Sequence, residues 1–392
     1  MDNKKQISQY GKLFEYLKDP DMRTKEMGEE VMEVTGALFS GVSFREMSWK
    51  NIRFVECDFT GSYELKLARL ENCLFTGCRF AGLFSFGLAK DVHFSNCVVR
   101  GNADSALYTD KGSTNVVFEN SDIQSLAADI ETWGSLVMDG EAKYINCGVK
   151  WFHLSGGEKL DIERCRIEQS IIARSGIEVH PPVTITDTEL LGTTDMVSSY
   201  MSSLTMRNCT VGVLDLKQAH VSGDVLLEKV VGERIDLSVK SARNVTVRNC
   251  TLKATEDQKF SFEIASDSTD QLLLQDCNFG EVPVAIGPGG WLPEDVLQAA
   301  PRNSLTRLIA CKLSSLDSAY AFSKAISIEG CTISIADFSN SRIGNLQIQA
   351  STISQKLDLR NTRIQSHSIK DLQPNQYRQV LLEGSNIKQL SS

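Results

Sequence analysis

The sequence has 392 residues and a formal net charge of −9, with 42% apolar and only 7% aromatic residues. A mildly acidic chain does not favour nonspecific nucleic-acid binding, because such binding depends on Lys and Arg contacts to phosphates. No apolar run reaches the roughly 18 residues of a membrane-spanning helix, and the charged N-terminus lacks the apolar stretch of a signal peptide. We therefore expect a cytoplasmic protein with no membrane association, and the eleven cysteines fit a reducing compartment.

Residues 1–36 have a helical pattern. Apolar and aromatic side chains recur at helical spacing, at Ile7, Tyr10, Leu13, Phe14 and Leu17. Asp19 before Pro20 is a helix-start signal, and Gly36 could end the last helix. We predict a short N-terminal α-helical cap over residues 1–36, which would cover the open edge of a repeat that begins at residue 37.

A five-residue step replaces this pattern from residue 39. Large side chains recur at Phe39, Phe44, Trp49, Phe54 and Phe59, then at Met206, Val211, Leu216, Val221, Leu226 and Val231, and again from Ile328 to Ile353. Five fits neither the 3.6-residue period of a helix nor the two-residue period of a strand. It fits a chain that turns a corner every five residues, with one inward side chain per side and about twenty residues per coil.

The cysteines follow the same step. Each of the eleven stands two residues before an apolar position of the repeat, as Cys57 stands before Phe59 and Cys331 before Ile333. Ala336 and Ser351 fill the same slot, so a small side chain is required there. Because Cys packs as a small buried hydrophobe and no CxxC pair is present, we predict buried packing residues rather than catalysts, zinc ligands or disulfides.

The triplets Ala336-Asp337-Phe338, Cys57-Asp58-Phe59 and Leu357-Asp358-Leu359 resemble the A(D/N)LXX unit of pentapeptide-repeat proteins. The resemblance implies an all-β fold, a right-handed quadrilateral β-helix, over residues 37–392. The sequence departs from the family pattern at Leu214, Ile235 and Leu346, which are large residues in small-residue slots. Segments such as residues 244–252 also resemble coils of three-sided β-helices of the pectate-lyase type. The coils of those proteins, however, do not keep a five-residue step on every side.

Polar stretches predict loop insertions near 101–114, 126–142, 174–182, 192–203, 253–270 and 280–304. The longest insertion, about 280–304, contains Trp291, Glu294 and Asp295. An exposed Trp is a typical anchor of protein contacts, so these three residues are a candidate partner-contact loop. Packing of Trp291 on the solenoid wall is the alternative.

No catalytic, cofactor-binding or metal-binding pattern stands out. The histidines (His93, His153, His180, His220 and His367) form no HExxH motif, and there is no GxSxG. Asp161, Asp215, Asp236 and Asp358 each precede an inward residue, where an aspartate can accept backbone N–H bonds at a corner. Asn72, Asn96, Asn146, Asn208 and Asn249 precede cysteines directly, and stacked amides there would form a ladder.

These features favour a non-enzymatic solenoid that binds macromolecules, most simply an immunity- or effector-like scaffold or inhibitor with a protein partner. The family resemblance adds one alternative, a DNA mimic that interacts with gyrase. After residue 36, however, 35 basic and 42 acidic residues leave only −7 for such a mimic. A carbohydrate-active β-helix enzyme, which would need paired carboxylates, is a further alternative. The C-terminal coils have no evident cap, so we predict a homodimer through them or docking of that end on a partner, with no direct nucleic-acid binding and no cofactor.

Overall fold

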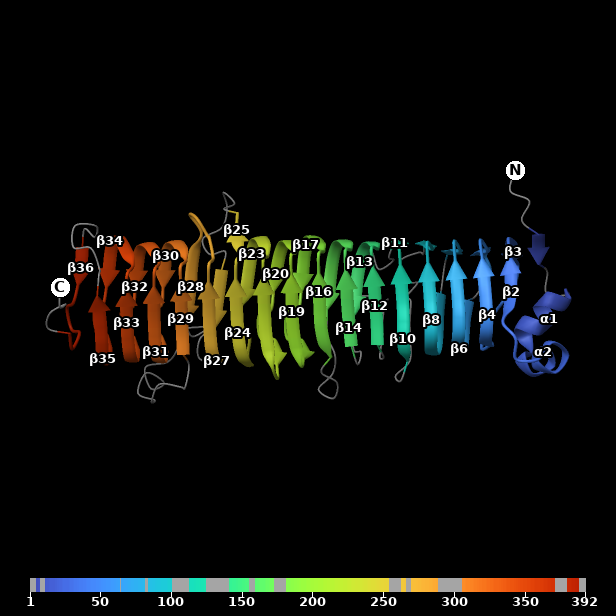
Figure 1. Cartoon of the computed structure of the whole chain (residues 1–392), viewed down its shortest axis with the longest axis horizontal. Coiled ribbons are helices and arrows are strands. Elements are labelled where there is room, and N and C mark those ends of the chain that lie inside the picture. Colours follow the sequence, from blue (N-terminus) through green and yellow to red (C-terminus); the bar gives the residue numbers. More distant parts are fainter. Residues whose placement is uncertain are drawn as a thin grey trace. The chain divides into compact units, whose positions relative to one another are not determined.

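The computed structural model describes residues 5–7, 11–63, 65–81, 84–100, 113–124, 141–154, 159–172, 181–253, 262–265, 269–287, 305–370 and 379–387. The chain divides into two compact units, unit 1 (Met1–Gly192) and unit 2 (Thr193–Ser392). Strands of two parallel sheets, here called sheet A and sheet B, run through each unit (Figure 1). Each unit is therefore an all-β parallel solenoid, as the five-residue step predicted.

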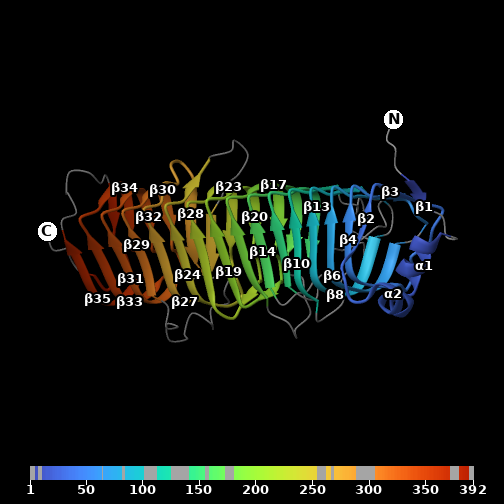
Figure 2. The same ribbon diagram turned by 45° about the vertical axis from the view of Figure 1, so that its right-hand side comes forward.

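Two short helices lie at the start of unit 1, beside its first strands (Figure 2). Helix α1 spans Lys12–Lys18 and helix α2 spans Pro20–Met27. The Asp19 carboxylate accepts a hydrogen bond from the Met22 N–H (2.9 Å), and Pro20 occupies the first helical position, where its missing N–H costs nothing. Leu17 is fully buried, and its carbonyl accepts a hydrogen bond from the Trp49 indole (3.1 Å). The predicted cap is therefore present as two helices.

The cap is shorter than the predicted residues 1–36. Gly28 ends α2 at a φ of 75°, and strand β2 (Met32–Thr35) already pairs in register with β4. Met32 and Val34 are buried while Glu33 and Thr35 are exposed, which is the alternation of a strand. The helical pattern hid this strand because it is only four residues long.

In unit 1, sheet B contains β2, β4 (Ser48–Val55), β6 (Leu65–Thr76), β8 (Phe84–Ser95), β10 (Thr114–Glu119), β12 (Glu141–Ile145), β14 (Lys159–Glu163) and β16 (Pro182–Thr186). Sheet A contains β1 (Lys5–Ile7), β3 (Ala37–Ser40), β5 (Asp58–Gly61), β7 (Arg79–Ala81), β9 (Val98–Arg100), β11 (Asp122–Gln124), β13 (Gly148–Leu154) and β15 (Arg166–Ile172). Strand β17 (Glu189–Asp195) crosses the boundary between the units.

In unit 2, sheet B contains β19 (Ser203–Arg207), β22 (Asp224–Glu228), β24 (Ala242–Arg248), β27 (Thr269–Gln275), β29 (Leu305–Ile309), β31 (Phe322–Glu329), β33 (Arg342–Gln349) and β35 (Arg363–Lys370). Sheet A contains β20 (Thr210–Asp215), β23 (Val231–Leu237), β25 (Thr251–Leu252), β26 (Phe262–Ala265), β28 (Pro283–Gly287), β30 (Lys312–Asp317), β32 (Thr332–Asp337), β34 (Thr352–Asp358) and β36 (Gln379–Leu381). Strands β18 (Tyr200–Met201) and β21 (His220–Val221) form a separate small pair.

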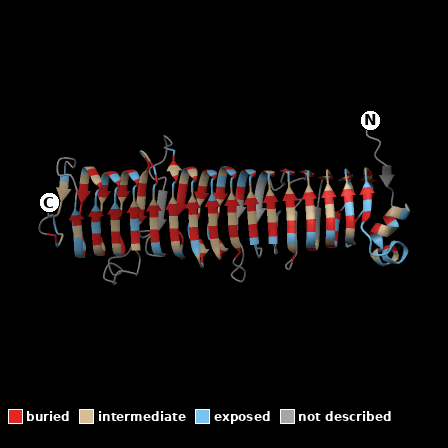
Figure 3. Cartoon of the chain, in the orientation of Figure 1, coloured by how far each residue is buried: buried red, intermediate tan, exposed pale blue. Residues whose placement is uncertain are grey.

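The five-residue step holds most clearly in the last coils of unit 2. Inward residues at that step are all buried: Ile328, Ile333, Phe338, Ile343, Ile348 and Ile353. Ile333 pairs directly with Ile353 on the next coil. Four steps of five residues therefore make one coil, after which the chain lies beside the preceding coil. Buried residues recur along the strands of these coils (Figure 3).

The step slips once where the sequence predicted continuity. Leu226 and Val231 are only partly buried, whereas Val225, Leu227 and Val230 are buried. An additional residue after Val221 shifts the step, so that Leu226 points outward. A one-residue slip moves a strand residue to the opposite face.

Three of the predicted insertions contain regular structure. Residues 192–203 form ordinary sides of a coil, because Met196 and Met201 are fully buried and continue the step toward Met206. Strand β26 lies within 253–270, and β28 lies within 280–304. Small residues that suggested loops lie in strands at some of these positions, as Gly192 and Thr193 do in β17 and Gly287 does in β28.

The backbone conformation at the corners of the coils explains why asparagines recur there. All five asparagines predicted to form a ladder have a positive φ, as do glycines at equivalent corners such as Gly77 and Gly330. Asn tolerates this left-handed conformation better than most residues. Side-chain amides of neighbouring coils form hydrogen bonds two at a time: Asn146 donates to Asn120 (2.7 Å), and Asn72 donates to Asn51 (2.8 Å). Asn72 lies at a different corner from the other four. The structure therefore has separate hydrogen-bonded asparagine pairs in place of one continuous ladder.

Candidate functional site

A row of aspartates ends the sheet A strands of unit 2. Asp215 pairs with Asp236, and Asp317 pairs with Asp337, which pairs in turn with Asp358. In-register residues of neighbouring strands lie about 4.8 Å apart. The carboxylates therefore stack along one side of the unit.

All five carboxylates accept hydrogen bonds from the backbone. Each accepts a hydrogen bond from the N–H two residues later, at 2.8–3.1 Å, from Lys217, Ser238, Ala319, Ser339 and Arg360 respectively. Such Asx turns fix the corner that follows the strand. The backbone role predicted for Asp215, Asp236 and Asp358 is confirmed. Asp161 differs, because it lies in β14 and pairs with the Lys159 ammonium (2.9 Å).

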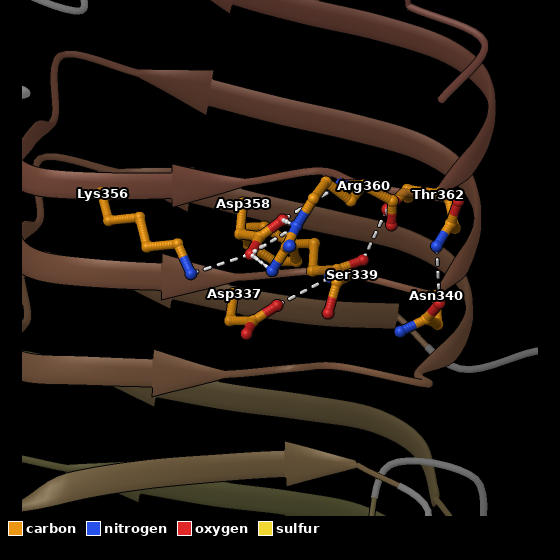
Figure 4. A network of polar contacts seen from close by, with 9 residues as sticks. Asp337, Ser339, Asn340, Lys356, Asp358, Arg360 and Thr362 are labelled. Atoms are coloured by element: carbon orange, nitrogen blue, oxygen red, sulfur yellow. Dashed lines mark hydrogen bonds and ion pairs between the residues drawn. The ribbon is translucent and has the colours of Figure 1, made fainter. Parts of the chain in front are cut away.

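Asp358 is the most constrained member of the row (Figure 4). Its side chain is fully buried and contacts the Lys356 ammonium (2.9 Å) and the Arg360 guanidinium (2.7 Å). Burial alone would raise the pKa of Asp358, but the hydrogen bonds from Arg360 and Lys356 outweigh it and hold the pKa well below the ordinary value. The Lys356 side chain is 29% exposed, and its ammonium neutralises this buried carboxylate.

A shallow hollow of about 290 Å³ lies beside this network, lined by Ser339, Asn340, Arg360, Asn361 and Glu383. Asn340 and Asn361 sit at left-handed corners, and the Asn361 amide donates to the Asn340 side chain (3.2 Å). The hollow offers one guanidinium and one carboxylate from successive turns. The hollow could form polar contacts with a ligand through these two groups. Its lining contains one carboxylate, whereas glycoside hydrolysis requires two.

The cysteines and histidines lie where the repeat places them. All eleven cysteines are buried, as predicted. His93 lies on the outer side of β8, with its Nε2 3.2 Å from the Glu119 carboxylate, and His220 stacks on Tyr200 with ring centroids 4.7 Å apart. Within the described ranges, no three His, Cys, Asp or Glu side chains converge as metal ligands. In the same part of the chain, neither helix is long and apolar enough to cross a bilayer.

The outer side of sheet B in unit 2 has a different character. Its outward residues on β22, β24, β27 and β29, here called the sheet B face, are Leu226, Glu228, Thr246, Arg248, Leu273, Gln275, Arg307 and Ile309. They form two in-register columns, in which Leu226, Thr246 and Leu273 are neighbours. All three are partly exposed, so two leucine side chains reach the surface of the parallel sheet.

Arginines border these apolar residues. The Glu228 carboxylate bridges the Arg207 and Arg248 guanidinium groups, at 3.0 and 2.9 Å. The hydrogen bond from Arg248, supported by Arg207, lowers the pKa of Glu228. Sequence reasoning missed this face because it assigned Leu226 to the interior. The three residues predicted as a contact loop, Trp291, Glu294 and Asp295, lie outside the described residues. The same is true of His180.

These observations define a class: a repeat protein whose coils are built from five-residue sides around a narrow apolar interior. Residues 37–77 match the model of pentapeptide repeats in eight copies. The resemblance to pentapeptide-repeat proteins is therefore confirmed over these residues. No curated protein matches its sequence. A solved structure of a trypsin-treated variant of QnrB1, described as a plasmid-mediated fluoroquinolone resistance protein, matches with 16% identity over 56% of this chain and 82% of that chain, at a TM-score of 0.20.

Proposed function

We propose that this chain is a non-enzymatic binding solenoid, a scaffold or inhibitor that holds another protein against the sheet B face of unit 2. The observation that carries the proposal is the arrangement of Leu226 and Leu273 on the outside of a parallel sheet, beside Arg248. Arginine is enriched at protein interfaces relative to the remaining surface, and the core of an interface is more apolar than its rim.

The rigidity of the sheet supports this role. The partly exposed side chains project from strands that are hydrogen-bonded on both sides, as β24 is to β22 and β27. A partner would therefore meet side chains that are already positioned, and little conformational entropy would be lost on binding. The Glu228 bridge also holds the Arg207 and Arg248 side chains in place before any partner arrives.

The aspartate row favours this proposal over the two alternatives. A DNA mimic needs exposed negative charge, but Asp236 and Asp358 are buried and Asp358 is neutralised by two cations. A carbohydrate-active enzyme needs a carboxylate that is free to donate or accept a proton. The backbone hydrogen bonds to these aspartates give them a structural task instead.

The test compares two matched substitutions of an apolar outward residue by a charge. Leu273→Asp alters the sheet B face, and Ile335→Asp alters an exposed position of β32 in sheet A. A protein captured from a lysate by the immobilised wild-type chain would be purified and its Kd measured. We expect Leu273→Asp to weaken binding by about tenfold or more while Ile335→Asp binds as wild type, with both variants melting alike. Equal binding by the two variants would contradict the proposed face.

The loop that contains Trp291 is proposed as a second contact. Strand β28 ends at Gly287 and β29 begins at Leu305, so a deletion has to start after Gly287 to leave the sheet intact. Replacing residues 289–303 by a short Gly-Ser linker, and separately Trp291→Ala, should weaken partner binding without lowering the melting temperature. A lower melting temperature in both variants would assign Trp291 to wall packing.

Self-association is proposed through the C-terminal coil. Strand β35 pairs with β33, and no described strand pairs with its other edge. Asn386 covers part of that edge by accepting from the Ile364 N–H (2.9 Å) and donating to the Ile364 carbonyl (2.5 Å). The last described strand, β36, pairs with β34 in sheet A and does not cover β35. Light scattering tests the dimer, and a mass near 43 kDa at every concentration would contradict it.

A further inference from the structure

Nine of the eleven cysteines lie in three columns in which cysteines of successive coils are direct neighbours. Column one contains Cys57, Cys78 and Cys97, column two Cys147 and Cys165, and column three Cys250, Cys277, Cys311 and Cys331. The residues that follow them pair in register, as Asp58 with Arg79 and Arg79 with Val98, Gly148 with Arg166, and Thr251 with Asn278, Lys312 and Thr332 in turn. The register therefore stacks thiol on thiol.

The two remaining cysteines have no such neighbour in the next coil. Cys73 pairs with Ile52 and Val92, and Cys209 is followed by Val230. The columns end where another small residue takes the slot. The Cys97 N–H donates to the Ser121 hydroxyl (3.1 Å) and the Cys331 N–H to the Ser351 hydroxyl (3.1 Å).

Within a column, sulfur takes the place of these hydroxyl groups. The Cys147 N–H donates to the Cys165 Sγ and the Cys311 N–H donates to the Cys331 Sγ, both at 3.4 Å. The thiol of one coil therefore lies directly against the cysteine of the preceding coil. Neighbouring strands are about 4.8 Å apart, which lies inside the Cα–Cα range of about 4.4–6.8 Å that disulfides span.

We propose that the three columns are redox-controlled staples, in which oxidation joins neighbouring cysteines and locks one coil to the next. Two thiols and one molecule of glutathione disulfide give one protein disulfide and two molecules of glutathione, so the two electrons and two protons move to the small-molecule disulfide. Each staple closes a loop of one coil, which restricts the unfolded chain. It also opposes separation of adjacent coils, each of which contacts only its neighbours.

The thiols are protected while the coils are closed. Contact with the Cys250 and Cys311 thiols, together with burial, raises the pKa of the Cys277 thiol. Burial raises the pKa of the isolated Cys73 thiol to about 11. Since the thiolate is the attacking species, exchange requires local opening of a coil, and a closed disulfide is then equally protected from reduction.

The columns predict a definite thiol count. Column one can form a single disulfide and keeps one thiol, column two forms one, and column three forms two. Eight of the eleven cysteines are then consumed, which leaves three free thiols, those of Cys73, Cys209 and one member of column one. Unselective oxidation of an odd number of cysteines would leave one.

The test uses the full chain in a glutathione disulfide buffer, which allows incorrect pairs to exchange. One sample enters the buffer folded, and the other is refolded into it from denaturant, where every thiol is accessible. Alkylation in denaturant followed by intact mass should show three modified cysteines in both samples. Peptide mapping should give the Cys147–Cys165 pair, and the oxidised protein should unfold at a higher denaturant concentration than the reduced protein.

Two matched variants make the count specific. Cys165→Ser removes one column, so four thiols should remain free, whereas Cys73→Ser should leave two and all four disulfides. Eleven free thiols in both samples, disulfides that involve Cys73, or identical unfolding of the oxidised and reduced protein would overturn the proposal.

Discussion

The ion pairs of Asp358 make a substitution at this position informative. In Asp358→Asn the amide oxygen can still accept the Arg360 N–H, but the contacts with the Lys356 ammonium and the Arg360 guanidinium lose their charge partner. A hydrogen bond to a charged group contributes about 1.5–3 kcal/mol. The Lys356 and Arg360 side chains are 29% and 44% exposed, so water replaces part of what is lost. We expect a loss of about 2 kcal/mol in the free energy of unfolding at pH 7.

The matched control is Asp317→Asn in a preceding coil. Asp317 accepts the same backbone bond, from Ala319 (3.0 Å), and its in-register neighbour is the like-charged Asp337. Removing that charge keeps the turn and relieves repulsion between carboxylates. We expect a change within about 0.5 kcal/mol, so the difference between the variants isolates the ion pairs of Asp358.

The pH dependence has a defined sign. The folded pKa of Asp358 lies below its unfolded value, so its stabilisation is complete above the unfolded pKa of about 3.9 and is lost as the pH falls toward the folded pKa. Urea unfolding followed by circular dichroism at pH 7 and pH 3 should therefore show a smaller gap between wild type and Asp358→Asn at the lower pH. An equal cost for both variants at pH 7, or a gap that grows in acid, would refute this assignment.

Four further substitutions, of which Ala325→Gly is a control, test the coil geometry by the same unfolding measurement. Ala350 has a φ of 48°, so Ala350→Gly should stabilise the protein by about 1 kcal/mol, while Ala325→Gly in the middle of β31 should destabilise it. Gly344→Ala would place a Cβ 2.4 Å from the Lys324 carbonyl oxygen and should cost about 2 kcal/mol. The buried Thr306 hydroxyl has no hydrogen-bond partner, so Thr306→Val should gain about 1 kcal/mol. If the free energy of unfolding changed in the opposite direction for any of these variants, the position assigned to that residue in its coil would be contradicted.

The sequence predicted the interior better than the outside. The step from Ile328 to Ile353 and the cysteine slot follow directly from inward packing, which tolerates few residue types. The left-handed corners also left a signal, in asparagines such as Asn146.

The outer surface leaves a weaker trace, because many side chains are acceptable where solvent is present. Lys356 and Asp358 lie two residues apart in β34, a spacing that places both side chains on one face of the strand, but the sequence alone does not show that the carboxylate is buried. The extra residue that turned Leu226 outward was equally invisible, since one residue reverses the face of a strand. The sheet B face was therefore found only in three dimensions.

The five-residue step determines which side chains face the interior, and thiol accessibility tests it most directly. The reduced native protein would be treated with a small alkylating reagent, and intact mass would follow the number of modified cysteines over time. Buried thiols in all eleven slots predict almost no modification of the native protein and eleven modifications in denaturant. Rapid modification of several cysteines in the native protein would contradict the inward assignment.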